Sequence, residues 1–134
     1  MNYDEFIGQV QHRARLSSRA QAERATRAFL ETLSQRLAGG EPKHIASQLP
    51  PELGRYLLEP LAGAGMRYGP RDLYELMSMR EGVDVPEAAH HARAVASVLR
   101  EAVSQGAWEN MLAQLPPELD QLLESGSEGE APNP

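Results

Sequence analysis

The hexapeptide QLPPEL occurs twice in the sequence, as Gln48–Leu53 and again 66 residues later as Gln114–Leu119. The similarity continues upstream of the hexapeptide at the same offset. The matched pairs are Ala22 with Ala88, Arg27 with Arg93, Ala28 with Ala94, Phe29 with Val95, Leu33 with Leu99, Gly40 with Gly106, Ile45 with Met111 and, after a one-residue gap, Phe6 with Leu73 and Val10 with Met77. Six consecutive identities in one register, extended by these pairs, indicate an internal duplication of the chain.

Both copies have the residue spacing of α-helices. The residues that recur at helical spacing are Ala22, Thr26, Phe29, Leu30, Leu33 and Leu37 in the first copy and Ala88, Ala92, Val95, Ala96, Leu99 and Val103 in the second. This period predicts long helices over residues 18–38 and 85–104. No stretch alternates apolar and polar residues with an enrichment in β-branched types, so strands are not expected.

Local residue types mark the ends of these two helices. Ser17 or Ser18 can cap the first helix, and Asp84 can cap the second. Gly39-Gly40 and Gly106 are expected to end them. A short segment then precedes each Pro-Pro pair, whose first ring disfavours a helical conformation at the preceding leucine. The pair therefore separates that segment from the last helix of each repeat.

We predict an all-α fold, a tandem duplication of a three- to four-helix unit packed as one pseudo-two-fold helical bundle. Two short bundles cannot each bury enough apolar surface alone, so they are expected to share one core. Residues 1–124 form the predicted single domain, with repeat 1 at 1–62, repeat 2 at 70–124 and a Gly-rich linker at 63–69. Residues 125–134 lack large apolar side chains and are predicted to be a disordered acidic tail.

The composition excludes several classes of protein. The chain has 134 residues and no cysteine, which excludes disulfides, thiol catalysis and cysteine-ligated zinc. No apolar run reaches the length of about 18 residues that a membrane span needs. The first residues include Asp4 and Glu5, where a signal peptide has basic and then apolar residues. We therefore expect a cytoplasmic protein that does not bind membranes, and the excess of arginine and alanine is typical of a bacterial source.

The charges are unevenly placed along the chain. The net charge is −6, and residues 101–134 contain acidic residues but no basic one. The most basic stretch contains Arg13, Arg15, Arg19, Arg24, Arg27 and Arg36. No aromatic residue alternates with these arginines as a stacking surface for bases requires, and Glu23 lies four residues before Arg27 as in a solvated helix. Nucleic-acid binding is therefore not favoured.

Several of these segments together resemble a known bacterial family. They are Tyr3-Asp4-Glu5-Phe6 with Val10, the helical segment at residues 22–33, Gly39-Gly40-Glu41 and Gln48-Leu49-Pro50. The chain resembles, over residues 1–124, the bacterial family known as domain of unknown function 2267. The resemblance implies a compact all-helical fold and supplies no activity, substrate or site residue.

Two Glu-x-x-His sequences raise the question of a metal site. They are Glu41 with His44 and Glu87 with His90, and two such pairs are half of a di-iron site in a helical bundle. The other half needs an inward-facing glutamate from each of two further helices, and Glu31 lies off the apolar stripe of its helix. Both acids also stand in first helical turns, where the helix dipole favours them without any metal. We predict no metal, no cofactor and no catalytic residue.

The segment at residues 72–80 has an unusually wide apolar arc. Its members are Leu73, Leu76 and Met77 on one face, with Tyr74 and Met79 on opposite flanks. Methionine side chains adapt to more than one partner surface. Trp108, the single tryptophan, aligns with Pro42 and is therefore not part of the repeated pattern. It is expected either to seal the core of the second copy or to stand exposed as an anchor.

The function that these features favour is a non-enzymatic protein-interaction or regulatory module. The predicted partner-binding residues are Tyr74, Met77, Met79 and Trp108, for a protein partner or for self-association through residues 72–80. The alternative is a small metal-binding protein or enzyme that uses histidine and glutamate residues of both repeats. A seam between the two repeats would also account for the apolar arc without any partner.

Overall fold

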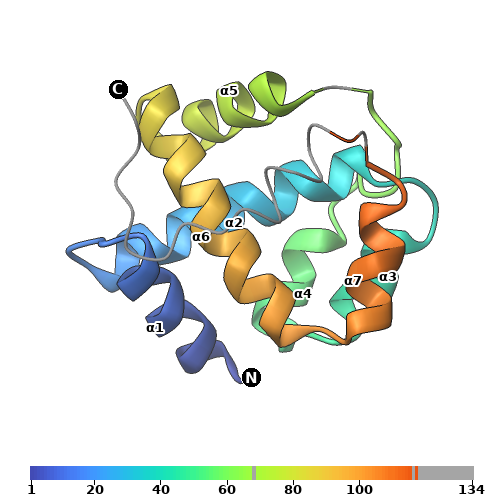
Figure 1. The fold of residues 1–134 in the computed structure, drawn as a ribbon, viewed down its shortest axis with the longest axis horizontal. Helices are drawn as coiled ribbons and strands as arrows, with labels where there is room; N and C mark the ends of the chain where they lie inside the picture. The colour runs from blue at the N-terminus through green and yellow to red at the C-terminus, as the bar shows by residue number, and fades with distance from the viewer. Residues whose placement is uncertain (68, 116, 118–134) are drawn as a thin grey trace.

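The structure, a computed structural model, describes residues 1–67, 69–115 and 117 and is built from helices (Figure 1). The elements in chain order are α1 (Tyr3–Arg13), α2 (Arg19–Arg36), α3 (Glu41–Ala46), α4 (Pro51–Gly54), the 3₁₀ helix η1 (Arg55–Leu57), α5 (Pro70–Glu81), α6 (Val85–Ala102) and α7 (Gln105–Leu112). Within these ranges the structure has one isolated antiparallel β-bridge, between Ala38 and Ala64. The prediction of an all-α fold is confirmed. The predicted tail at 125–134 lies outside the described residues.

Side-chain caps start the two long helices where the sequence predicts them. Of the two candidate serines, Ser18 caps α2 by accepting a hydrogen bond from the backbone N–H of Gln21 at 3.2 Å. Asp84 caps α6 by accepting from the backbone N–H of Glu87 at 2.9 Å. Each cap satisfies an amide that has no partner inside the helix.

The two long helices end differently from the prediction. Each ends two residues earlier, because the chain leaves α2 at Leu37 and α6 at Val103 in an extended conformation. Gly106 was expected to end the second helix, and this expectation is wrong. Ser104 starts a new helix there by accepting from the backbone N–H of Ala107 at 3.1 Å, so Gly106 lies in the first turn of α7.

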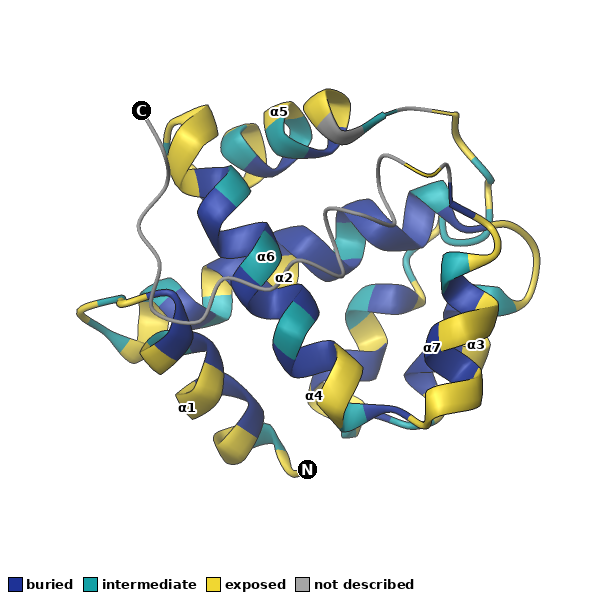
Figure 2. Cartoon of the chain, viewed as in Figure 1, coloured by how far each residue is buried: buried dark blue, intermediate teal, exposed yellow. Residues whose placement is uncertain are grey.

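Helices α2 and α6 form the centre of the molecule. Figure 1 shows them crossing, with α5 and α1 on opposite sides of the crossing and α3, α4 and α7 together at one end. Both α1 and α5 pack on both central helices. Figure 2 shows the central helices buried over most of their length. The largest fully buried side chains are Trp108, Phe6, Phe29, Ile7, Leu30, Leu37, Ile45, Leu53, Leu57, Leu73, Met77 and Leu99. None of the described helices is both long and apolar enough to cross a membrane.

The Gly-rich segment before α5 is bound to the end of α2. The hydrogen bonds run from Gly63 N to Ser34 O (2.9 Å), from Gly65 N to Leu37 O (3.0 Å) and from Met66 N to Gln35 O (2.8 Å). The last carbonyls of a helix have no partner within the helix, so these bonds satisfy them. The segment predicted as a linker therefore also caps α2.

Replacing Gly63 with alanine is expected to lower the free energy of unfolding by about 1–3 kcal/mol. Gly63 has a φ of 81°, and a Cβ built there would lie 2.4 Å from the backbone oxygen of Gly39. Urea denaturation followed by circular dichroism measures the change. The matched control is Gly8→Ala in α1, where a Cβ meets nothing within 4 Å. That control should raise stability by about 0.5–1 kcal/mol because alanine is the better helix former; equal effects of the two substitutions would contradict the prediction.

Candidate functional site

The four predicted partner-binding residues lie in different environments. Met77 and Trp108 are 0% and 1% exposed and belong to the core of this chain. Tyr74 is half-buried against that core, whereas Met79 is 81% exposed. Met77 lies on the face of α5 that packs on the central helices, and Trp108 is buried in α7. Neither residue therefore presents a side chain at the surface. Binding of a partner through Tyr74 and Met79 stays a prediction.

The two Glu-x-x-His sequences do not form a common cluster. In α3, Glu41 Oε1 and His44 Nδ1 are 3.8 Å apart, and His44 is exposed. In α6, Glu87 is exposed while His90 is buried, with its Nε2 3.2 Å from the carbonyl oxygen of Ala14. The described part of the chain contains no group of three or more histidine, aspartate or glutamate side chains that could hold a metal ion.

A buried acid–histidine pair that the sequence analysis missed joins α5 to α6. Glu81 Oε2 lies 2.5 Å from His91 Nδ1, and the two side chains are 3% and 6% exposed. The other carboxylate oxygen of Glu81 is buried with no hydrogen-bond partner. Alignment of the two copies could have indicated this pair, because the first copy has Ala14 and Ala25 at the corresponding positions. A polar residue that replaces a buried alanine between copies is a signal of a new polar contact.

His90 lies beside this pair. Its ring centroid is 6.0 Å from that of His91. Burial is the main cause that lowers the pKa of His90, and the proximity of His91, Arg93 and Arg15 lowers it further, whereas the hydrogen bond to the Ala14 carbonyl raises it.

Two arginines cross from the short helices to the central ones. The contacts are Arg13 Nη1 with Ser97 Oγ (3.1 Å) and Glu101 Oε2 (2.5 Å), and Arg80 Nη1 and Nη2 with Thr32 Oγ1 (2.7 Å) and Gln35 Oε1 (2.9 Å). Arg13 therefore holds α1 to α6, and Arg80 holds α5 to α2. Arg13 also lowers the pKa of Glu101 through this hydrogen bond. These arginines serve helix packing.

Other arginines of the basic stretch are paired with carboxylates on the surface. Arg19 Nη2 is 2.5 Å from Asp4 Oδ1, and Arg27 Nε is 3.2 Å from Glu31 Oε2. Exposed pairs of this kind contribute little to stability, about 0–1 kcal/mol each. They do reduce the positive field that a nucleic-acid phosphate would meet.

A shallow cleft of about 280 Å³ lies between α2 and η1. Its lining residues are Arg27, Arg55, Tyr56 and Glu59. The guanidinium carbons of Arg27 and Arg55 are 5.4 and 5.0 Å from the centre of the Tyr56 ring. The pKa of Glu59 is raised, chiefly by a hydrogen bond with Glu31. The cleft therefore contains side chains of both charges.

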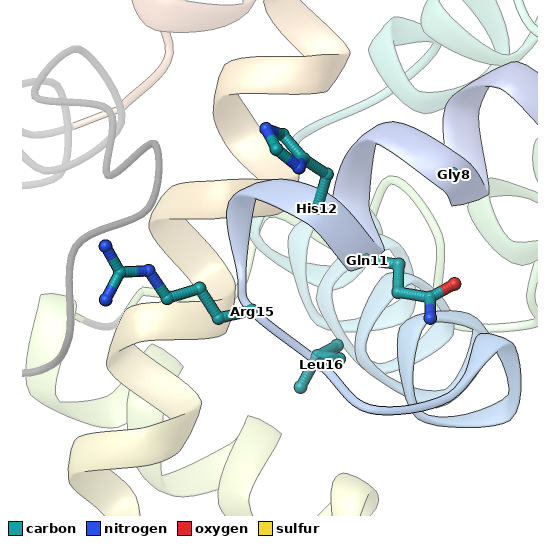
Figure 3. Close-up of a pocket in the computed structure, with 5 residues that line it drawn as sticks. All are labelled: Gly8, Gln11, His12, Arg15 and Leu16. Atoms are coloured by element: carbon teal, nitrogen blue, oxygen red, sulfur yellow. The ribbon is translucent and has the colours of Figure 1, made fainter.

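A second hollow, of about 490 Å³, lies at the end of α1 (Figure 3). It is lined by Gly8, Gln11, His12, Arg15 and Leu16. In Figure 3 the side chains of His12 and Arg15 extend on one side of the end of α1, and that of Gln11 extends on the other. Sequence reasoning did not single out this place, because its residues follow no motif.

Comparison with known proteins gives one family. Residues 3–122 match the model of a family described as uncharacterized conserved protein (DUF2267). The match spans most of the chain and includes both copies of the repeated segment. No curated protein matches the chain. The resemblance indicated by the segments between Tyr3 and Pro50 is thus confirmed, and this protein belongs to the DUF2267 family.

Proposed function

We propose that this protein is a non-enzymatic protein-interaction module that associates through residues 72–80 of α5. The observation that supports the proposal is the exposure of Met79, whose side chain is the most exposed of the large apolar side chains described. Methionine suits an adaptable contact surface, and tyrosine, here the half-buried Tyr74, is enriched at protein interfaces. The first partner to test is a second copy of the chain.

The polar pairs of the described residues also favour an interaction module over an enzyme. The Glu81–His91 pair is buried away from solvent. Arg13 is bound to a side chain of α6, and Arg80 is bound to a side chain of α2. Catalysis requires acid, base or nucleophile groups that reach a substrate. Each of these groups is engaged in joining two helices.

Sedimentation velocity at increasing concentration tests the proposed surface. We expect the wild type to self-associate and Met79→Glu to weaken that association at least tenfold, because a carboxylate would be desolvated at the contact. The matched control is Leu61→Glu, which alters another exposed apolar side chain outside residues 72–80. A wild type that stays monomeric at all concentrations, or equal effects of the two variants, would contradict the proposal. Stoichiometric iron, zinc or manganese in the purified protein would favour a metal-binding protein instead.

We further propose that residues 1–62 and 70–124 are two copies of one unit related by a pseudo-two-fold axis. Helices α2 and α6 support this, since each has 18 residues and α6 starts 66 residues after α2. Their caps, Ser18 and Asp84, are separated by the same offset. An experimental structure in which the two halves do not superpose would contradict the duplication.

Reciprocal contacts of the repeated hexapeptide also support the duplication. Oε1 of Gln48 accepts a hydrogen bond from the backbone N–H of Ser104 at 2.7 Å, just beyond α6. Oε1 of Gln114 accepts from the backbone N–H of Ala38 at 2.9 Å, just beyond α2. The two acceptors, Gln48 and Gln114, are 66 residues apart, and so are the two donors, Ala38 and Ser104. A two-fold relation between the halves would produce this exchange, in which each glutamine binds the opposite half.

A further inference from the structure

Arg15 has a backbone conformation that normally belongs to glycine. Its φ is 54°, and it is the one non-glycine residue with a positive φ in the described ranges. Beyond α1 its N–H donates to His12 O at 3.2 Å, and Leu16 N donates to Gln11 O at 2.9 Å. This hydrogen-bond pattern is a Schellman ending, in which glycine is usual because a Cβ is strained there.

The second half of the chain has glycine at the corresponding place. With the one-residue gap of the alignment, Arg15 corresponds to Gly82, which follows α5 with a φ of 76°. A positive φ at this place is therefore adopted without strain in one half and with strain in the other. A strained backbone conformation that persists is a reason to look for a role of the side chain.

The side chain of Arg15 is exposed just beyond the end of α1. It lines the hollow of about 490 Å³ together with His12, on the same side of the end of α1 (Figure 3). In the described part of the chain neither residue is within ion-pair distance of a carboxylate, in contrast to Arg13, Arg19 and Arg27.

The last carbonyl oxygens of α1 and the Ala14 oxygen that follows them are hydrogen-bonded within the chain. The carbonyl oxygens of Val10, Gln11 and His12 accept hydrogen bonds from the backbone N–H groups of Ala14, Leu16 and Arg15. The Ala14 oxygen is bound to the ring of His90. Each of these four oxygens therefore already accepts a hydrogen bond.

We propose that the hollow at the end of α1 binds the phosphate group of a small phosphorylated solute, held by the Arg15 guanidinium and the His12 imidazole. A guanidinium matches two oxygens of a phosphate at once, and a third oxygen is left for a donor on the imidazole. The hollow is open to solvent and its volume exceeds that of phosphate alone, so the body of the solute has room along Gly8 and Leu16.

Titration of the full chain with glycerol 3-phosphate tests this site, with chloride used to keep the ionic strength constant. We expect saturable shifts of the NMR signals of the His12 ring and a saturable rise in the urea midpoint of the wild type. Arg15→Gly and His12→Gln should each weaken the apparent affinity at least tenfold. The charge-matched control Arg24→Gln, on the exposed face of α2, should leave the affinity unchanged.

Arg15→Gly gives a second readout that separates loss of binding from loss of folding. Without ligand this variant should have a higher urea midpoint than the wild type, because it removes the strained Cβ as Gly82 does in the other half. A lower midpoint, an unchanged affinity in Arg15→Gly, or no saturable response of the wild type would each overturn the proposal. Binding to phosphatidic acid vesicles without any response to glycerol 3-phosphate would overturn the assignment to a small solute.

Discussion

Replacing His91 with leucine is expected to lower the free energy of unfolding by about 3–5 kcal/mol. His91 Nδ1 is 2.5 Å from a carboxylate oxygen of Glu81, and both side chains are almost fully buried. Leucine fills similar space without a polar atom, so the carboxylate of Glu81 would remain buried with no partner. Burial of an unpaired carboxylate is strongly unfavourable in a medium of low polarity. Urea denaturation monitored by circular dichroism at neutral pH measures the loss.

The double variant Glu81→Leu/His91→Leu distinguishes loss of the pair from loss of packing. Its stability should be close to or above that of the wild type, because two apolar side chains can replace a buried pair at no net cost. The second oxygen of Glu81 has no hydrogen-bond partner even in the wild type, which adds to the expected gain. If the double variant loses as much unfolding free energy as the two single variants lose together, Glu81 and His91 do not stabilise each other.

The starts of the helices could be predicted from the sequence because their causes are local. Ser18 and Asp84 cap α2 and α6 through bonds to amides three residues away. The apolar period that follows each cap is also a property of one short segment. For the same reason the prediction of an all-α chain needed no knowledge of tertiary contacts.

The ends of the helices and the polar pairs could not be predicted in this way because they depend on distant residues. Helix α2 ends where Gly63 and the residues after it bind its carbonyls, and the chain between them forms further helices. Gly106 lies within α7 because Ser104 starts a helix just before it. Glu81 meets His91 only because α6 folds back along α5. Sequence spacing alone does not show which of these distant residues come into contact.

The apolar arc at residues 72–80 shows what helical periodicity can and cannot predict. A helical period places Met77 and Met79 about 160° apart around α5 at roughly 100° per residue. It does not say which of the two directions faces the core. Packing of α5 on α2 and α6 decides this, with Met77 buried and Met79 exposed. Trp108 had no counterpart in the first copy, so its alternatives of core and anchor stayed open until the position of α7 was known.

Replacing Trp108 with alanine is expected to lower the free energy of unfolding by about 3–5 kcal/mol. The side chain is 1% exposed in the shared core, and α7 packs on α3 across this end of the molecule. Alanine would leave a cavity that the surrounding helices fill only in part. Since small domains have about 5–15 kcal/mol of stability in total, the urea midpoint should fall by a large fraction of its value. The matched control is Leu61→Ala, which removes an exposed apolar side chain outside residues 72–80 and should change stability by less than about 0.5 kcal/mol. A Trp108→Ala variant as stable as this control would place the tryptophan outside the core.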